Sequence, residues 1–185
     1  MNRKRKLSHK ILYVAYVATS IDGKIAKSGH SGTDWTSKED WNFFQKSLSQ
    51  MDAVIVGHNT YNIAKDRLKW RNTIVLTSKV DTPKQSGKIV FFNPEKLNLK
   101  KFLQNKNYKK VAVLGGSRVY DFCLCNKMLD KLYMTIEPYV FTSGVSMFLG
   151  NKFKKYKFSL QSVKKLNKKG TILLQYKNAN SSHKN

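Results

Sequence analysis

Acidic residues are scarce in this chain, and their scarcity sets its charge. Eleven Asp and Glu stand against 35 Lys and Arg, for a formal net charge of +24. Such an excess can indicate nucleic-acid binding. However, arginine makes most bidentate contacts to bases and phosphates, and it occurs only at positions 3, 5, 67, 71 and 118. We therefore predict a lysine-coated surface that attracts an anionic small molecule, and we keep a basic nucleic-acid-binding protein as an alternative.

Cysteine and long apolar runs are scarce as well. The two cysteines, Cys123 and Cys125, are one residue apart, which is too close for an easy disulfide and too few for a metal site. No apolar run approaches the ~20 residues of a membrane span, and the run at 11–20 lacks a good signal-peptide cleavage pattern. We predict a cytoplasmic monomer or homodimer with a small-molecule substrate, no metal and no membrane partner.

The apolar segments that are present are short and rich in Val, Ile, Leu, Tyr and Phe, which is typical of strands. They lie at 11–20, 53–57, 73–78, 88–92, 110–115, 130–138, 156–166 and 171–177. Helices fit between several of them. This order predicts an α/β fold with a mostly parallel central sheet of about eight strands and a C-terminal antiparallel hairpin. One domain at 10–178 would carry it, between a disordered basic tail at 1–9 and a disordered tail at 179–185.

Helix starts can be predicted from capping residues. Thr36 is the expected N-cap of the first helix, with Glu39 three residues on completing a capping box. A second helix should follow Gly57, and a third should begin at 93–95 ("NPE"), where proline suits the first helical position. A fourth should follow the diglycine at 115–116.

Two strand–glycine–helix junctions are candidate phosphate sites: "AVIVGHNTY" (53–61) and "VAVLGGSRVY" (111–120). Glycine lets the backbone approach a ligand, and helix N-terminal amides face whatever binds. Neither junction is a P-loop, G-x-G-x-x-G is absent, and a diglycine is often only a tight turn. Two junctions in one sheet suit a pyrophosphate. "VLTSK" (75–79) could add a ribose-phosphate site or simply cap a turn.

Asp40 lies in "DWTSKEDWNFF" (34–44), where three of the eleven acids stand among aromatic residues. A carboxylate beside Trp35, Phe43 and Phe44 could accept paired N–H bonds from a flat, amidine-like heterocycle that the rings hold. The alternative is that Asp40 only favours the positive end of the helix.

From about Ile11 to Phe148, the sequence resembles dihydrofolate reductase and the riboflavin-pathway pyrimidine reductases of the same superfamily. In the dihydrofolate reductase pattern a tryptophan precedes the pterin-binding acid by five residues, as Trp35 precedes Asp40. A Gly-x-x-Thr motif resembles 57–60, and an arginine fourteen residues after its glycine resembles Arg71. "VATSIDGKIA", "GGSRVY" and "LYMTI" are similar to the first strand with its mobile loop, the second diglycine turn, and the strand whose threonine bonds the catalytic acid.

Other segments are similar to the pyrimidine reductase branch, namely "SIDGKIA", "DWTS", "MDAVIVG" and "MLDKLYMTIEP". Arg67-Leu68 stands where that branch has its substrate-phosphate arginine. Leu114 departs from the branch, which usually has a glutamate before the diglycine. His58 departs from dihydrofolate reductase, which usually has an arginine there. On this balance we rank dihydrofolate reductase first and the pyrimidine reductase second.

The resemblance implies a three-layer fold of the dihydrofolate reductase type and an NADPH-dependent reductase. The expected reaction is dihydrofolate to tetrahydrofolate, with hydride transfer from nicotinamide C4 to pterin C6. The alternative is reduction of a ribosylaminopyrimidine 5′-phosphate in riboflavin biosynthesis, and Lys24 is the residue that such a site would use. For dihydrofolate reduction, Lys24 would be only a solvated loop lysine.

The resemblance also assigns site residues. The catalytic residues would be Asp40, Trp35 and Thr135. The substrate would contact Ala18, Asp40, Phe43, Phe44, Arg67, Leu68, Arg71 and Thr135. The cofactor would contact Ala18, Ile25, Gly57, His58, Asn59, Thr60, Thr77, Ser78, Lys79, Leu114, Gly115, Gly116, Ser117, Arg118, Val119 and Tyr120.

Overall fold

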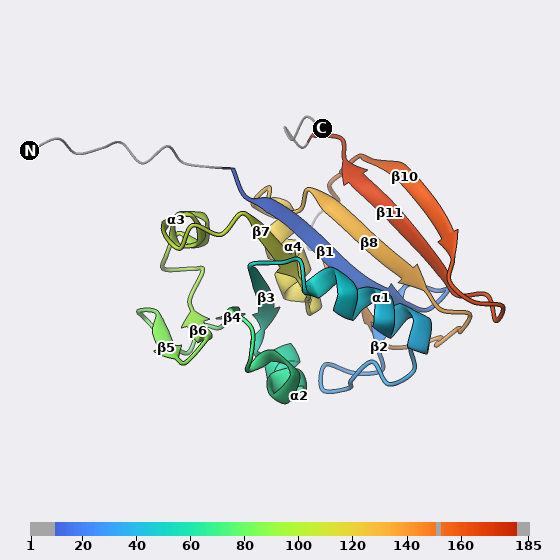
Figure 1. Ribbon diagram of the computed structural model, residues 1–185, viewed down its shortest axis with the longest axis horizontal. Coiled ribbons are helices and arrows are strands. Elements are labelled where there is room, and N and C mark those ends of the chain that lie inside the picture. The colour runs from blue at the N-terminus through green and yellow to red at the C-terminus, as the bar shows by residue number, and fades with distance from the viewer. Residues whose placement is uncertain (1–9, 151–152, 181–185) are drawn as a thin grey trace, which may run out of the picture.

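The computed structural model describes residues 10–150 and 153–180. The tail predicted at 1–9, and positions 181–185 of the tail predicted at 179–185, lie outside the described residues. The elements, shown in Figure 1, are β1 (Leu12–Thr19), β2 (Lys24–Ala26), α1 (Lys38–Leu48), β3 (Ala53–Gly57), α2 (His58–Leu68), β4 (Thr73–Leu76), β5 (Lys84–Ser86), β6 (Ile89–Phe92), α3 (Leu99–Asn105), β7 (Lys110–Val113), α4 (Ser117–Cys125), β8 (Lys131–Ile136), β9 (Val145–Ser146), β10 (Phe158–Lys165) and β11 (Ile172–Asn178).

The main sheet has nine strands in the order β10-β11-β8-β1-β7-β3-β4-β6-β5. Its six central strands, from β8 to β6, pair in parallel. The antiparallel hairpin β10–β11 extends one edge, and β5 pairs antiparallel with β6 at the other. A separate small sheet pairs β2 with β9. The predicted mostly parallel α/β sheet with a C-terminal antiparallel hairpin is therefore confirmed.

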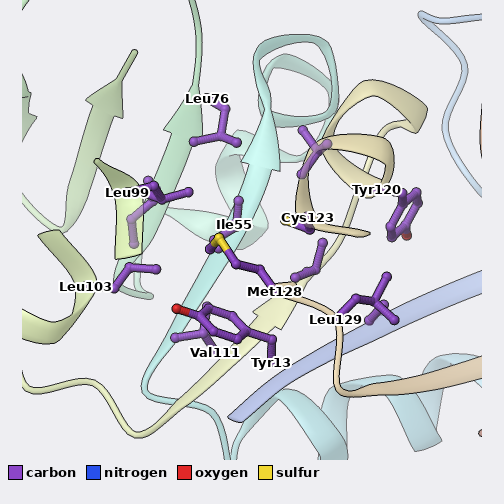
Figure 2. Packing of buried hydrophobic residues seen from close by; sticks show 14 of the residues in the cluster. Tyr13, Ile55, Leu76, Leu99, Leu103, Val111, Tyr120, Cys123, Met128 and Leu129 are labelled. Carbon is purple, nitrogen blue, oxygen red and sulfur yellow. The ribbon is translucent and has the colours of Figure 1, made fainter. Parts of the chain in front are cut away.

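The central strands are apolar because helices cover both faces of the sheet. In β3, Val54, Ile55 and Val56 are at most 1% exposed. Residues of α1 and α2 pack on one face, where Leu48 and Leu68 join a buried cluster. Residues of α3 and α4 pack on the other face, where Leu103 and Cys123 belong to the same buried cluster as Ile55 and Met128 (Figure 2). The fold therefore has three layers, helices, sheet and helices.

Strand β1, which comes first in the chain, lies inside the sheet between β8 and β7. It pairs with β7 from Leu12 opposite Lys110, and with β8 up to Thr19 opposite Ile136. All the parallel strands point the same way, so their carboxyl ends meet at one edge of the sheet. In open α/β sheets this edge is where ligands bind.

The first helix begins one residue later than predicted. Ser37, not Thr36, is the N-cap, and its hydroxyl accepts the N–H of Asp40 at 3.3 Å. The expected capping box with Glu39 is also wrong, because the N–H of Ser37 is satisfied by Glu137 Oε1 at 2.7 Å. The carboxylate of Glu137, which is far away in the sequence, therefore accepts the N–H that Glu39 was expected to bind. Asp40 is the third residue of the helix.

The third helix begins later than the predicted 93–95. The side chain of Asn93 accepts the N–H of Glu95 at 3.1 Å, which forms a local turn. The helix starts at Leu99, where the side chain of Asn98 accepts the N–H of Lys101 at 3.0 Å. Both asparagines bond the backbone a few residues on, but only the second does so at a helix start. Within the described parts of the chain, no helix combines the length and the apolar character that crossing a membrane requires.

Candidate functional site

A cavity of about 940 Å³ lies at the carboxyl edge of the parallel strands. The ends of β1, β3, β4, β7 and β8 contribute to its lining, together with α1 and the first residues of α2 and α4. Every residue predicted to bind substrate or cofactor lines this cavity, with the exception of Gly115. The structure thus brings the predicted set together, while the role of each residue stays a prediction.

Asp40 is a buried carboxyl group at one side of this cavity, with 9% of the residue exposed. Burial raises the pKa of its carboxyl group, and the negative charge of Glu137 adds to the rise. Interactions with the polar side chains of Thr135 and Thr36 lower the pKa of the carboxyl group and oppose the rise in part. The carboxyl group therefore keeps its proton to a higher pH than an exposed aspartate does.

An aromatic wall stands beside Asp40. The rings of Tyr16 in β1 and Tyr133 in β8 are stacked, with centroids 5.2 Å apart. Phe43 and Phe44 of α1 pack against Tyr16, at centroid distances of 6.4 and 6.0 Å. All four rings line the cavity. Flat rings around one buried carboxyl group suit a planar heterocycle whose N–H groups the carboxyl can bind.

Trp35, predicted as catalytic, does not line the cavity. Its indole packs edge-on against Phe141, with centroids 4.9 Å apart. The indole Nε1 is buried and has no hydrogen-bond partner. Trp35 therefore reaches the site only through its neighbours along the chain.

Two helix N-termini open into the cavity from its other side. The N-caps of α2 and α4 are Gly57 and Gly116, and neither provides a side-chain cap. The first-turn N–H groups of both helices therefore need a partner from outside the helix. The N–H of Gly57 donates to the carbonyl of Gly115 at 2.7 Å, which holds the two turns together. Near the first turn of α2, Nδ1 of His58 is buried without a hydrogen-bond partner.

The glycines at these turns are closely packed, so that a Cβ atom would come into close contact with neighbouring side chains. A Cβ on Gly57 would lie 3.2 Å from Cγ2 of Val119, and a Cβ on Gly115 would lie 2.6 Å from the ring of Tyr120. Two uncapped helix N-termini beside close-packed glycines form a site for an extended anion. A dinucleotide with its pyrophosphate fits these residues.

Cationic side chains lie at both sides of the cavity. The guanidinium of Arg67 stands 4.8 Å over the ring of Trp41, and Nη1 of Arg71 donates to the carbonyl of Leu48 at 3.0 Å. Lys79 and Arg118 line the side where the two helices begin. The cavity can therefore neutralise one anion near α1 and another near α4.

Besides Trp35, Lys24, which we named only for the pyrimidine reductase alternative, lies outside the cavity lining, and sequence reasoning missed two residues of this region. The Nζ of Lys24 lies 3.4 Å from Oγ of Ser146, where β2 meets β9. The role of Trp41 as the surface on which Arg67 rests was missed. Glu137 was missed as well, although it follows Thr135 by two residues, and alternate strand residues face the same side of a sheet.

Comparisons with known proteins agree with this geometry. A bifunctional dihydrofolate reductase-thymidylate synthase of Acanthamoeba polyphaga mimivirus is 33% identical over 108 residues, which cover 53% of this chain but only 19% of that protein. The deaminase/5-amino-6-(5-phosphoribosylamino)uracil reductase of Thermotoga maritima superposes with a TM-score of 0.70 at 17% identity, over 92% of this chain and 57% of that one.

Dihydrofolate reductase from Enterococcus faecalis, solved with NADP(H), superposes with a TM-score of 0.65 at 24% identity, over 91% of this chain and 97% of that one. These two likenesses confirm the predicted fold of the dihydrofolate reductase type. The model of the RibD C-terminal domain matches residues 13–172. The chain belongs to the RibD C-terminal domain family.

Proposed function

We propose that this protein reduces a ribosylaminopyrimidine 5′-phosphate, with NADPH as the hydride donor. Family membership and the name of the Thermotoga maritima enzyme support this reaction class. The observation that carries the proposal is Arg67. Its guanidinium lies over Trp41 and lines the cavity of Asp40, and among the described residues no acid pairs with it. An arginine held in this way is suited to a substrate phosphate.

The reaction converts an open-chain imine of the sugar to an amine. NADPH, when bound, supplies the hydride that the sugar carbon C1′ gains. The imine nitrogen must gain a proton at the same time, and the C=N bond becomes a single bond. Asp40 is placed to hold this proton, because its raised pKa keeps the carboxyl group protonated nearer to neutral pH. Tyr16, Phe43 and Phe44 would orient the pyrimidine ring against it.

The same residues support NADPH as the cofactor. The N-termini of α2 and α4 would bind its pyrophosphate, and the close-packed glycines would let the backbone approach it. The Enterococcus faecalis reductase, which shares this fold, was solved with NADP(H).

Dihydrofolate is the second candidate substrate, because Thr135 bonds the buried carboxyl of Asp40 and the mimivirus relative carries a dihydrofolate reductase name. Arg71, which would hold the glutamate carboxylate of folate, donates one N–H to Leu48 and has further N–H groups for a carboxylate. Because the family model that matches is that of the RibD C-terminal domain, we place dihydrofolate behind the aminopyrimidine, which reverses the ranking from sequence.

NADPH oxidation with the two substrates side by side tests the proposal. We expect turnover with 5-amino-6-(5-phosphoribosylamino)uracil to exceed turnover with dihydrofolate. Faster turnover with dihydrofolate, together with a raised KM for dihydrofolate in Arg71→Leu, would transfer the assignment to folate.

Arg67→Met should raise the KM for the phosphorylated substrate by about 10- to 150-fold, because losing one charge-assisted pair costs about 1.5–3 kcal/mol. The effect on kcat should be small, since the phosphate is remote from the reacting bond. Steady-state kinetics measure both constants. Lys65→Met is the control, since Lys65 is an exposed residue of α2 that does not line the cavity. Equal KM values in the two variants would remove Arg67 from the phosphate site.

Lys79→Glu should weaken NADPH binding by about tenfold or more and NADH binding much less, because only NADPH carries the 2′-phosphate. Lys79 lines the cavity beside Thr77 and Ser78. Fluorescence titration with each dinucleotide gives the two dissociation constants. Lys84→Glu changes an exposed lysine of β5 outside the cavity lining and should alter neither constant. Equal weakening of both dinucleotides by Lys79→Glu would contradict this placement.

A further inference from the structure

Glu137 is a carboxylate in the interior of the protein, with 2% of the residue exposed. It follows the last residue of β8, and its backbone N–H donates to the carbonyl of Thr19 at 2.8 Å, which continues the pairing of β8 with β1. A buried carboxylate is costly unless it is hydrogen-bonded or paired with a cation. Among the described residues, no Lys, Arg or His forms an ion pair with Glu137 or with Asp40.

The two oxygens of Glu137 join two separate parts of the fold. Oε1 accepts the N–H of Ser37, the N-cap of α1, at 2.7 Å. Oε2 accepts the hydroxyl of Thr171, at the β10–β11 turn, at 2.7 Å. Asn167 of the same turn bonds both Thr171, at 2.9 Å, and Glu39 of α1, at 3.2 Å. The first turn of α1 is thereby tied to the end of β8 and to the C-terminal hairpin.

This connection reaches Asp40 directly. Ser37, which Glu137 holds, accepts the N–H of Asp40. Thr135, which bonds the Asp40 carboxyl, precedes Glu137 by two residues and so lies on the same side of the sheet. Asp40 is thus positioned from its backbone through Ser37, which Glu137 holds, and from its carboxyl group by Thr135 of β8.

Glu137 is the charged group that acts on Asp40 from the neighbouring elements. Its charge raises the pKa of the Asp40 carboxyl. Tyr16 on β1 and Tyr133 on β8 are uncharged near neutral pH, because burial raises the pKa of both phenols, that of Tyr16 to about 12. Glu39, beside Asp40 in α1, is exposed and interacts with Asn167, Lys169 and Lys38.

We propose that Glu137 is a positioning residue for Asp40, which fixes the first turn of α1 by its two hydrogen bonds and places a second negative charge behind the Asp40 carboxyl group. Glutamine can accept the N–H of Ser37 through its amide oxygen, and its NH2 group can donate to the hydroxyl oxygen of Thr171, so Glu137→Gln keeps an anchor at both places while the second hydrogen bond reverses its direction. The charge favours the protonated form of Asp40, the form that donates a proton. This inference rests on the proposed function for the task of Asp40, but the placement of the two carboxyl groups does not depend on a substrate.

Two variants separate the charge from the anchor. Glu137→Gln keeps the shape and removes the charge, so the titration midpoint of Asp40 should move to lower pH. The fall of kcat/KM with rising pH should begin at correspondingly lower pH. Glu137→Asp keeps the charge but is one methylene shorter and cannot reach both Ser37 and Thr171. It should lower kcat/KM across the whole pH range and leave the onset of the fall near that of the wild type.

The midpoint is measured without substrate, by carbon NMR of the protein labelled at the carboxyl groups of Asp and Glu, with Asp40→Asn identifying the Asp40 signal. Glu39→Gln is the matched control and should leave the Asp40 midpoint unchanged. In Glu137→Asp, which keeps the charge, the Asp40 midpoint should stay near that of the wild type. This second variant decides the question even if Glu137→Gln does not fold.

The outcomes distinguish this inference from the proposed function. An unchanged Asp40 midpoint in Glu137→Gln, or an Asp40 midpoint in Glu137→Asp well below that of the wild type, overturns the electrostatic role, whatever the substrate. A shifted midpoint in a protein that does not reduce the aminopyrimidine supports the positioning of Asp40 and rejects the proposed reaction alone. A uniform loss of kcat/KM in Glu137→Gln with no change of the pH profile would leave Glu137 as a structural anchor and refute the proposal.

Discussion

Asp40→Asn is expected to lower kcat/KM by about 10²- to 10⁴-fold at neutral pH, the range that a positioned proton donor contributes. The amide has the shape of the carboxyl group but cannot give up a proton to the substrate nitrogen. Activity should recover in part at low pH, where solvent protonates the substrate. Measuring kcat/KM from about pH 5 to 9, with the dissociation constant of NADPH as a check that the fold and cofactor site survive, provides the test.

The same variant should be more stable than the wild type at alkaline pH. The pKa of Asp40 is raised in the folded protein, chiefly by burial, so the folded state binds this proton more tightly than the unfolded state. The resulting stabilisation is complete below the unfolded pKa and is lost as the pH rises through the folded pKa. Asn has no charge to bury, so its Tm should exceed that of the wild type at pH 8, and the difference should shrink in acid.

Near-normal kcat/KM and an unchanged Tm in Asp40→Asn would show that Asp40 serves only the helix N-terminus. The catalytic assignment would then be withdrawn. Asp34→Asn is a suitable comparison, because Asp34 is an exposed acid of the same segment that does not line the cavity.

Gly115→Ala should have the largest effect on stability, a loss of about 2–5 kcal/mol from left-handed backbone strain and overpacking together. Gly115 has a φ of +87°, and its new Cβ would lie 2.6 Å from Cε2 and 2.9 Å from Cζ of Tyr120. The Tyr120 ring has little freedom to move, because it is 2% exposed and its hydroxyl donates to the carbonyl of Tyr16 at 2.6 Å. Urea unfolding of the variant and the wild type measures the loss.

Gly116→Ala is the matched control one residue further on. A Cβ there would meet Oγ1 of Thr60 at 3.6 Å, an ordinary contact, and the φ of −67° suits alanine. Its stability should stay within about 1 kcal/mol of the wild type, while NADPH binding weakens because the methyl group occupies the uncapped start of α4. Similar stabilities of the two alanine variants would contradict the contact between Gly115 and Tyr120.

The features that could be predicted from sequence are those that local chemistry decides. Eight apolar runs became eight of the nine strands of the main sheet. In the central strands, burial on both faces requires a nearly continuous apolar sequence, whereas β10 at the edge is mostly exposed. The glycine junctions at Gly57 and Gly116 lead into α2 and α4 as expected. One side of the cavity lining follows from these junctions.

The features that could not be predicted depend on partners far away in the chain. Strands β2, β5 and β9 have only two or three residues each and exist through their pairings. The choice of Ser37 over Thr36 as the N-cap depends on Glu137, which is 100 residues away in sequence. Lys24 and Trp35 stand at the expected spacings, yet they lie outside the cavity lining, since spacing gives the order of residues but not the direction of a side chain.

The position of β1 inside the sheet, between β8 and β7, has a consequence for how the protein is made. On a ribosome, β1 emerges first, but its partners β7 and β8 begin at Lys110 and Lys131. At a synthesis rate of ~5–20 residues per second, β1 waits roughly 6–25 seconds until β8 is complete. Until β7 has been synthesised, the apolar strand Leu12–Thr19 has neither neighbour in the sheet. The nascent chain therefore exposes an unpaired apolar segment for most of its synthesis. A chaperone that binds this segment during synthesis should raise the yield of folded protein more than one that binds after release from the ribosome.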